Sequence, residues 1–398
     1  MKILYLNPLI LYPPLQGNQM TGLNRVKCLS KEHQIILVCF YNDKSQLTLQ
    51  LKILSEYCYK IIPVYLPKWK SLLNTAAGFI FSAKPLQLSY FYSVKMKKIL
   101  AHTNTENCDI IHVNTLRMEQ FIDQRISTPV LMDLHDSMIL NIQSRLKKEK
   151  GIYKYLYTAE LNRIRKYENN VVKKYPHLMV LAEQDKEIHA NNPAIEVIHL
   201  GVDTDIFKPH KELSCNKILI FSGNMSYTPN IDAIVWFIEN CWQAIIEQVP
   251  DSVFRIAGAN PAKDLDKYRS YKGIEITGKV ESMAAAINEA QLAIAPLRSG
   301  SGMQNKILEA MACGLPVVCT SVGLGNIKAV NDESILVKDD AATFIKACVE
   351  LLEDYSQCCK IGKNALMVIK QFYNIEYHCR LLEKLYVETI NDKNVNQY

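Results

Sequence analysis

A glycine-rich turn followed by a helical pattern offers the clearest chemistry in this sequence. The segment APLRSGSGMQNKILEAMACGLPVVCTSVG, residues 295–323, indicates a strand, a turn, a helix and a second strand. The apolar spacing predicts a helix that begins between Ser301 and Gln304 and stops at Gly314. The start of such a helix offers unpaired backbone N–H groups and the positive end of the helix dipole. The turn therefore predicts a site for an anion such as a diphosphate.

Two charged side chains interrupt the apolar pattern of this helix. Glu309 comes about two turns after the expected start, roughly 10 Å at 1.5 Å per residue. A carboxylate there could accept hydrogen bonds from both ribose hydroxyls of a nucleotide whose phosphates bind at the helix start, and Lys306 could neutralise those phosphates. The alternative is a surface ion pair between Lys306 and Glu309, worth a few tenths of a kcal/mol. The surrounding glycines and strands favour the nucleotide site.

The elements that must position these residues follow an α/β pattern. Short aliphatic runs alternate with longer amphipathic segments along the chain. Strands are expected in two series, which implies two separate parallel sheets. The first series comprises residues 2–6, 34–41, 61–66, 109–113, 129–134, 177–182 and 195–200, and the second comprises residues 217–223, 253–258, 274–280, 291–297, 316–320 and 334–340.

The boundary between the two sheets is expected where no periodic apolar face exists. The stretch GVDTDIFKPHKELSCN, residues 201–216, is rich in Gly, Pro and polar residues. We therefore expect an N-terminal domain over residues 1–205, a C-terminal domain over 206–375, and a final helix over 376–398 that packs back on the N-terminal domain. A ligand cleft should open between the two domains.

The charge of the chain is divided unevenly between its halves. Residues 1–209 carry 27 Lys and Arg against 18 Asp and Glu, a balance of +9, and the remainder carries 19 against 22, a balance of −3. Basic stretches at 95–98 and 145–150 could face an anionic membrane or a phosphorylated acceptor, or could be ordinary solvated helix faces. We expect no nucleic-acid partner, because no RNA- or DNA-binding motif accompanies the charge.

Cysteine usage and apolar runs indicate the cellular compartment of the protein. The 12 cysteines are scattered without metal-ligand spacing, so we expect reduced, mostly buried thiols. The start, MKILYLNPLILYPP, lacks the features of a secretory signal. The best apolar run, LLNTAAGFIF, is half the roughly 20 residues needed to span a bilayer. These features predict a cytoplasmic protein whose membrane contact, if any, is peripheral.

No metal or cofactor is expected. Asp203-Thr204-Asp205 has the form of the Asp-x-Asp motif of metal-dependent sugar transferases, but it lies in the expected linker, and we interpret it as structural. The sequence shows neither the His and Cys spacing of a zinc site nor a calcium-binding loop. We therefore predict that the chain needs no catalytic metal.

Several motifs together resemble one family of enzymes. SGSGMQNKILEAMACGLPVV, preceded by GVDTDIF and ITGKV, resembles the family 4, or group 1, glycosyltransferases of the GT-B fold. PVLMDLHDS, RKYENNVVKKYPHLMVLAEQD and IHLGVDTDIFKP stand in the order and spacing of that family. The resemblance covers nearly the whole chain and is specific in its C-terminal half. SGNMSYTPNIDAIVWF and MQNKILEAMA are similar to bacterial sugar transferases of exopolysaccharide and surface-glycan pathways.

The resemblance implies a fold and an activity. The fold would be two Rossmann-like domains whose parallel sheets face each other across a cleft. The activity would be metal-independent hexosyl transfer, with retention of anomeric configuration, from a nucleotide-diphosphate-sugar to a glycan or polyprenyl-linked glycan in surface polysaccharide biosynthesis. The Tyr-rich segments 86–100 and 151–167 could rest on the lipid surface that holds such an acceptor, or could be ordinary amphipathic helices.

The family's donor site maps onto the glycine-rich turn and its helix. Glu309 matches the glutamate that holds the donor ribose, and Ser301 stands where the family has its first glutamate, so that half of the motif is absent. Backbone amides at Gly302, Met303 and Gln304 would contact the sugar or the phosphates.

The family's cations for the diphosphate are missing from their usual place in this sequence. The family places an Arg and a Lys after the first strand of the C-terminal domain, where this sequence has Gly223 and Asn224. Arg298 or Lys306 would then supply the charge that the diphosphate needs.

The N-terminal half contributes two candidates. His135 matches an active-site histidine near the donor sugar, although a histidine that simply bonds to Asp133 or Asp136 would also fit the local sequence. Gly17 lies in the loop after the first strand, where the family brings the backbone close to the diphosphate or acceptor.

Other activities remain open on sequence grounds. An inactive GT-B binding subunit of a glycan-assembly complex is suggested by the missing glutamate and the missing cations. A nucleotide-sugar epimerase or a phosphorylase could use the same cleft. An NAD-dependent dehydrogenase is disfavoured because the first strand is followed by NPLILYPP rather than G-x-G-x-x-G.

Overall fold

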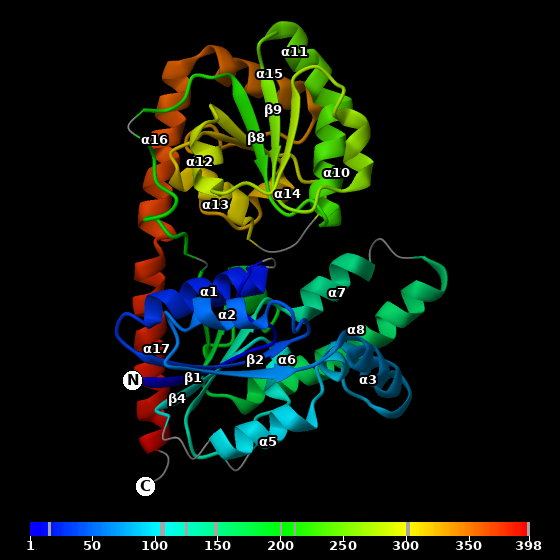
Figure 1. Cartoon of the computed structure of the whole chain (residues 1–398), viewed down its shortest axis with the longest axis vertical. Coiled ribbons are helices and arrows are strands. Elements are labelled where there is room, and N and C mark those ends of the chain that lie inside the picture. The colour runs from blue at the N-terminus through cyan, green and yellow to red at the C-terminus, as the bar shows by residue number, and fades with distance from the viewer. Residues whose placement is uncertain are drawn as a thin grey trace. The chain divides into compact units, whose positions relative to one another are not determined.

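A computed structural model gives the fold, and it describes residues 1–14, 17–103, 108–123, 126–146, 150–199, 201–210, 212–299 and 303–395. The chain forms two compact units (Figure 1). The N-terminal unit comprises Met1–His199 and Glu376–Tyr398, and the C-terminal unit comprises Leu200–Ile375. Each unit is built on its own parallel β-sheet.

The N-terminal unit has a seven-stranded sheet in the order β3-β2-β1-β4-β5-β6-β7. Every neighbouring pair is parallel, with Leu4 of β1 opposite Ile36 on one side and Ile111 on the other. The apolar runs form strands because helices cover both faces, so both side-chain directions are buried. The strands are β1 (Lys2–Asn7), β2 (Gln34–Tyr41), β3 (Lys60–Tyr65), β4 (Ile110–Asn114), β5 (Val130–His135), β6 (Leu178–Val180) and β7 (Ile195–Val197).

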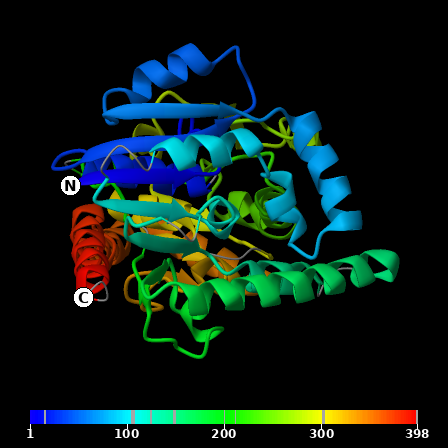
Figure 2. The ribbon, with the colours of Figure 1, turned by 90° about the horizontal axis from the view of Figure 1, so that it is seen from below.

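Two hydrophobic cores lie on the two faces of this sheet. One core contains side chains such as Ile3, Tyr5 and Leu37 together with Tyr386 from the last helix of the chain, and the other contains alternate strand residues such as Leu4 and Ile36. Helix α8 runs beside the sheet and projects past it (Figure 2). The helices are α1 (Gly17–Leu29), α2 (Leu47–Leu54), α3 (Lys68–Phe81), α4 (Leu86–Tyr90), α5 (Val94–Thr103), α6 (Leu116–Glu119), α7 (Met138–Leu146), α8 (Gly151–Lys174), α9 (Glu183–Glu187) and α17 (Ile375–Val395).

The C-terminal unit has a six-stranded parallel sheet in the order β10-β9-β8-β11-β12-β13. Its strands are β8 (Ile218–Ser222), β9 (Val253–Ala257), β10 (Ile274–Gly278), β11 (Leu292–Ala295), β12 (Val317–Cys319) and β13 (Leu336–Val337). Its helices are α10 (Thr228–Phe237), a π-helical segment (Ile238–Trp242), α11 (Gln243–Gln248), a 3-10 helix (Lys263–Tyr268), α12 (Met283–Asn288), α13 (Asn305–Ala312), α14 (Ser321–Leu324), α15 (Ala341–Glu353) and α16 (Tyr355–Phe372).

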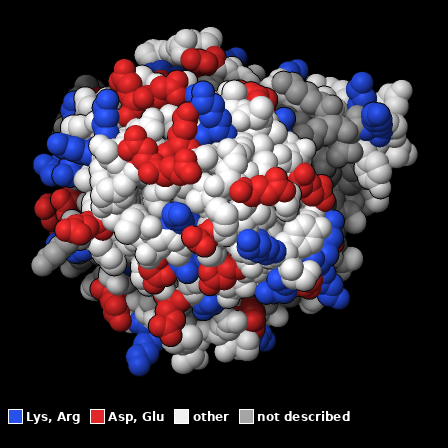
Figure 3. Space-filling view, turned by 90° about the horizontal axis from the view of Figure 1, so that it is seen from above, with Lys and Arg blue, Asp and Glu red and all other residues white. Residues whose placement is uncertain are grey.

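The expected α/β class and the two parallel sheets are confirmed. Each of the strands expected from the sequence overlaps a strand of the structure. Among the described residues, no helix combines the length and the apolar character that crossing a bilayer demands. One face of the molecule carries acidic and basic side chains interspersed with each other (Figure 3).

Candidate functional site

The carboxyl ends of β8 and β9 approach each other closely in the C-terminal unit. Gly223 follows β8 with φ 152° and Gly258 follows β9 with φ 154°. A Cβ atom on Gly258 would lie 1.6 Å from the carbonyl oxygen of Gly223, and one on Gly223 would lie 2.8 Å from Nδ2 of Asn230. Both turns therefore require glycine, and together they leave the backbone of this edge bare of side chains.

Lys306 reaches this glycine turn from helix α13. Its Nζ donates a hydrogen bond to Oδ1 of Asn230 at 2.6 Å and lies 4.8 Å from the ring centre of Phe221, and a Cβ on Gly223 would be 3.4 Å from its Cε. Asn230 is buried, and its Nδ2 donates to the backbone carbonyl of Asn224 at 2.9 Å. The structure thus brings Gly223, Asn224 and Lys306 together through Asn230.

Glu309 follows Lys306 by one turn of the same helix, on a face that is half-buried. Burial raises the pKa of Glu309 to about 7, and the nearby Lys306 opposes that rise. Burial also lowers the pKa of Lys306 to about 8, and Glu309 opposes that fall. Perturbation by desolvation with a specific charge partner is typical of functional sites. The surface ion pair considered as the alternative does not describe this half-buried pair.

This helix starts one residue after the expected range of Ser301 to Gln304. Helix α13 begins at Asn305, with Gln304 in an extended conformation before it. Glu309 therefore lies just over one turn from the first helical residue, about 6 Å along the axis rather than two turns. Met303, which precedes the helix, packs against a hydrophobic core of the C-terminal unit. Ser301 and Gly302 lie outside the described residues.

Arg298 is engaged away from this cluster. Its Nη1 donates to the carbonyl oxygen of Asp339 at 2.8 Å, and its guanidinium lies 4.8 Å from the ring centre of Trp236. The side chain is exposed and does not contact Asn230 or Gly223 in the way that Lys306 does. Of the two cations predicted to face a diphosphate, Lys306 is the one placed at the glycine turn.

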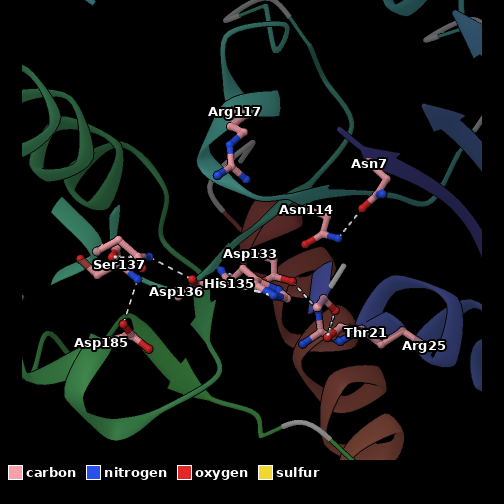
Figure 4. Close-up of polar contacts among 12 residues, drawn as sticks. Asn7, Thr21, Arg25, Asn114, Arg117, Asp133, His135, Asp136, Ser137 and Asp185 are labelled. Atoms are coloured by element: carbon pink, nitrogen blue, oxygen red, sulfur yellow. Dashed lines mark hydrogen bonds and ion pairs between the residues drawn. The ribbon is translucent and has the colours of Figure 1, made fainter. Parts of the chain in front are cut away.

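His135 ends strand β5 of the N-terminal unit in an unusual backbone conformation. Its φ is 68°, which costs a non-glycine residue roughly 1 kcal/mol or more and is found most often at functional sites. Its backbone N–H donates to Oδ1 of Asp133 at 2.8 Å (Figure 4). Its Nε2 lies 3.6 Å from Oδ1 of Asp136, and its buried Nδ1 has no hydrogen-bond partner among the described residues. Burial lowers the pKa of His135, so its ring is neutral at physiological pH.

A fully buried ionic network holds Asp133 behind His135. Arg25 of α1 donates to Oδ2 of Asp133, and Nε2 of His112 lies 3.4 Å from the same oxygen. Burial alone would raise the pKa of Asp133, but Arg25 and His112 outweigh it and hold the pKa below its usual range. His112 in turn binds the hydroxyl of Tyr386 in α17 through Nδ1 at 2.8 Å. The network fixes the backbone at His135 from both ends of the chain.

Two further carboxylates hold the start of helix α7, directly after His135. Ser137 N–H donates to Asp185 at 2.8 Å (Figure 4). Ser137 Oγ donates to Glu168 at 2.6 Å. The backbone of Met138 also donates to Glu168, at 3.1 Å. Burial raises the pKa of Asp185 to about 7. Sequence reasoning assigned no role to Glu168 or Asp185, although both lie in motifs shared with the family.

A cavity of about 720 Å³ lies in the N-terminal unit between the loops after β1 and β2 and helices α3 and α4. Arg117 donates from Nε and Nη2 to Oε1 of Gln87 at 3.0 and 2.7 Å at its wall. The buried Oε1 of Gln50, also on the wall, has no hydrogen-bond partner among the described residues. Aromatic rings and amides that line the same space are Tyr12, Tyr41, Tyr90, Phe91, Asn18 and Asn42. Rings and amides together suit a polar ring-shaped ligand such as a sugar.

Gly17 and Asp203 have local structural settings. Gly17 is exposed at the first residue of α1, and an added Cβ would meet nothing within 4 Å. The fold itself therefore does not demand glycine at position 17, and its approach to a ligand stays a prediction. Asp203 accepts hydrogen bonds from the backbone of Asp205 and Ile206 at 3.0 and 3.2 Å, as expected of a turn. Over the described part of the chain, no three His, Cys, Asp or Glu side chains are grouped to hold a metal.

The family of the C-terminal unit follows from its match to a family model. Residues 216–354 match the model of "Glycosyl transferases group 1". The C-terminal unit holds a group 1 glycosyltransferase domain. An uncharacterized 44.6 kDa protein of the cps region of Klebsiella pneumoniae is 21% identical over 378 residues, which are 91% of this chain and 94% of that protein.

Solved structures of similar shape show the fold of the whole chain. Sucrose-phosphate synthase from Thermosynechococcus elongatus superposes with a TM-score of 0.72 at 15% identity, covering 98% of this chain and 100% of that chain. Anabaena HepE in complex with UDP-glucose superposes with a TM-score of 0.65 at 16% identity, again covering 98% and 100%. The chain has the GT-B fold, as the family resemblance implies.

Within this glycosyltransferase domain, Asn230 is a site residue that the sequence did not predict, and its side-chain amide is buried. It joins the loop after β8 to Lys306 of α13. A polar residue in the first turn of an otherwise apolar helix, TPNIDAIVWF, was the signal available in the sequence. The resulting cluster presents a cation, a carboxylate and bare backbone at the carboxyl edge of a parallel sheet, where ligands bind in open α/β sheets.

Proposed function

We propose that this chain is a retaining, metal-independent glycosyltransferase that uses a nucleotide-diphosphate-sugar. The observation that carries the proposal is the cluster of Lys306, Asn230 and Glu309 beside the glycine turns of the group 1 domain. The complex of Anabaena HepE with UDP-glucose supports a nucleotide-sugar as the donor.

In this proposal the donor lies along helix α13. The diphosphate binds at the start of the helix and against Lys306, whose hydrogen bond to Asn230 holds its ammonium at the turn. Glu309 accepts hydrogen bonds from the ribose hydroxyls. Ser301, where the family has a glutamate, offers the donor sugar a hydroxyl instead of a charge. Arg298 is a second candidate cation, provided that it leaves the carbonyl of Asp339.

Transfer breaks the bond between the anomeric carbon and the diphosphate oxygen, and the electron pair leaves with the diphosphate. The acceptor hydroxyl attacks on the same face, through an oxocarbenium-like transition state, and its proton passes to the leaving phosphate. The helix start and Lys306 stabilise the charge that develops on the diphosphate, so no divalent cation is required. His135, neutral and held by Asp133, orients the donor sugar or the acceptor.

The acceptor in this proposal is a glycan or a polyprenyl-linked glycan of a surface polysaccharide. The cavity lined by Arg117, Gln50 and aromatic rings supports a sugar acceptor in the N-terminal unit. The Klebsiella relative, which lies in a cps region, supports a role in capsule or related polysaccharide synthesis. Such acceptors are used in the cytoplasm.

Donor hydrolysis followed by proton NMR tests this function without knowledge of the acceptor. The wild-type protein, incubated with α-configured UDP-, GDP- and ADP-sugars and a chelator, should slowly release one sugar, first as its α-anomer. His135→Asn should lower that rate by about 10²-fold, because the donor sugar loses the group that orients it. Asparagine tolerates a positive φ, so this variant keeps the backbone of His135 unstrained.

The matched control is His210→Asn, at an exposed histidine of the C-terminal unit, which should leave the rate unchanged. First release of the β-anomer would contradict retention. A well-folded protein that releases no sugar from any donor would contradict the enzymatic role and favour a binding subunit.

A further inference from the structure

Helix α3 of the N-terminal unit turns its apolar side toward solvent. Its buried positions are Ser71 and Gly78, a polar and a small residue. The exposed side carries large apolar residues whose exposed fractions are 64% for Trp69, 64% for Leu72, 61% for Leu73, 69% for Ile80 and 85% for Phe81. A surface helix of a globular protein normally buries its apolar stripe. The orientation of α3 is therefore inverted.

The packing of α3 fixes this inverted orientation. A Cβ on Gly78 would lie 2.2 Å from Oγ of Ser89 in α4, so the two helices meet where neither has a bulky side chain. Asn74 Nδ2 donates to the carbonyl oxygen of Tyr92 at 2.9 Å on the same side. Rotating α3 to bury Trp69 and Ile80 would break both contacts. The exposed apolar stripe is thus a property of the folded unit.

Helix α8 passes α3 and α4, and its first turns expose further apolar residues. Arg163 of α8 donates to the carbonyl oxygen of Phe79 in α3 at 3.3 Å, and Glu160 of α8 accepts from the N–H of Leu86 in α4 at 2.7 Å. The α8 residues that project past them are exposed by 71% for Ile152, 61% for Tyr153, 79% for Tyr155 and 42% for Leu156. We call the exposed apolar residues of α3 and of the start of α8 the α3 face.

The chain segment that contains α3 carries charge of a single sign. Residues 57–105 contain seven lysines and no Asp or Glu. Lys68 and Lys70 stand at the start of α3, and Lys84 follows its end. Lysines at the edge of an apolar stripe that contains Trp, Tyr and Phe are typical of helices that lie in the plane of an anionic lipid surface.

We propose that the α3 face docks this protein on an anionic phospholipid bilayer. At 14 residues, α3 is about 21 Å long, too short to span a bilayer but long enough to lie in its headgroup region. Trp69, Leu72 and Ile80 enter the headgroup boundary, and the flanking lysines pair with lipid phosphates. Charge complementarity selects the bilayer over a second copy of the chain, because a copy would bring the same lysines face to face.

Docking would also place the cavity proposed to bind the acceptor sugar at the membrane. Lys68 and Thr75 of the same helix line that cavity, so α3 separates it from the α3 face by one helix width. This step rests on the proposed function, and it assigns a lipid-linked rather than a free glycan to the cavity. The docking itself does not depend on it.

Vesicle binding tests the docking directly. Wild-type protein should co-sediment with vesicles of phosphatidylglycerol and phosphatidylcholine, less so at high salt, and not with phosphatidylcholine alone. Leu72→Gln with Ile80→Gln should lower the partition coefficient about tenfold or more. Lys70→Gln and Lys84→Gln should each lower it about fivefold. The control is Leu49→Gln in α2, at an apolar residue of the same unit that is 58% exposed. This variant should bind vesicles as strongly as the wild type does.

Tryptophan emission locates the contact. The chain has three tryptophans, Trp69, Trp236 and Trp242, and Trp69 is 64% exposed while Trp242 is buried. Vesicles should shift the emission of the wild type to the blue, and Trp69→Phe should remove that shift.

No binding to anionic vesicles, or binding that the α3 face variants leave unchanged, would overturn the proposal. A loss of dimers in light scattering by the Leu72 and Ile80 variant, without vesicle binding, would assign the face to a second copy instead. Nucleotide binding by the same variants, measured by calorimetry, should be unchanged. A failure of docking is therefore distinguishable from a failure of the proposed enzymatic function.

Discussion

Lys306 and Glu309 form a half-buried pair whose charges are sensitive to their surroundings. Burial brings their pKa values to about 8 and about 7, so both groups titrate near neutral pH. A bound anion would stabilise the charged form of Lys306, and hydrogen-bond donors would stabilise the charged form of Glu309. A diphosphate beside Lys306 and ribose hydroxyls on Glu309 would supply that stabilisation.

The affinity for a nucleotide should therefore fall on both sides of neutrality. Below pH of about 7, protonation of Glu309 removes the charge that strengthens its hydrogen bonds to ribose, so affinity falls as pH falls. Above pH of about 8, Lys306 loses its proton and its attraction for phosphate, so affinity falls as pH rises. Calorimetric titration of a nucleoside diphosphate across this range measures both slopes, each up to about tenfold per pH unit.

Two variants separate these slopes from the titration of the ligand itself. Glu309→Gln should lose the part of the acid-side fall that exceeds the titration of the phosphate, and Lys306→Met should lose the alkaline fall. A wild-type profile that matches that of Glu309→Gln at every pH would show that the carboxylate does not contact the ribose.

Single residues of the site differ in how well the sequence predicts them. Glu309 and Lys306 are predictable because they are charged residues inside an apolar helical stripe after a glycine-rich turn. Asn230 is not, because it is joined to Lys306 only by the fold, 76 residues apart. The network of Arg25, Asp133 and Tyr386 escapes sequence reasoning for the same reason.

At the scale of elements, the proposed donor site depends on the glycines that follow strands β8 and β9. The carbonyl of Gly223 passes so close to Gly258 that the loops after β8 and β9 leave no room for a side chain. This crowding leaves the backbone beside Lys306 without side chains at Gly223 and Gly258.

Gly258→Ala should destabilise the C-terminal unit by about 3 kcal/mol or more, because the new Cβ would lie 1.6 Å from a backbone oxygen at a φ of 154°. The measurement is the shift of the midpoint in urea unfolding followed by circular dichroism. Gly17→Ala is the matched control, since its Cβ meets nothing within 4 Å at the start of a helix, and it should change stability by less than about 0.5 kcal/mol. Equal shifts for the two variants would contradict the close approach of the two loops.

Elements are predictable from the sequence where burial dictates their composition. The central strands lie in parallel sheets buried on both faces, so they appear as continuous apolar runs. The start of α13 at Asn305, one residue after the expected range, could be predicted only approximately, because glycines and polar residues permit helix as well as turn. The outward apolar side of α3 is unpredictable, because periodicity shows that a stripe exists but not which way it faces.

Across the whole molecule, net charge is distributed unevenly between the two units. The N-terminal half carries a balance of +9 and the C-terminal half −3. The positive excess lies in the unit that contains the α3 face and the cavity proposed for the acceptor, which suits an anionic membrane or a phosphorylated lipid carrier. The group 1 domain holds the proposed donor site within the other unit.

The central claim is that the C-terminal unit binds a nucleotide-sugar through Glu309 and Lys306. The most direct measurement is calorimetric binding of UDP, GDP, ADP and CMP, without added metal, to the wild-type protein and to Glu309→Ala. We predict that one nucleoside diphosphate binds the wild type and that its affinity falls about tenfold or more in the variant, as expected for lost hydrogen bonds to a charged group. Binding of none of the four nucleotides to well-folded wild-type protein, or equal binding by the variant, would contradict the account.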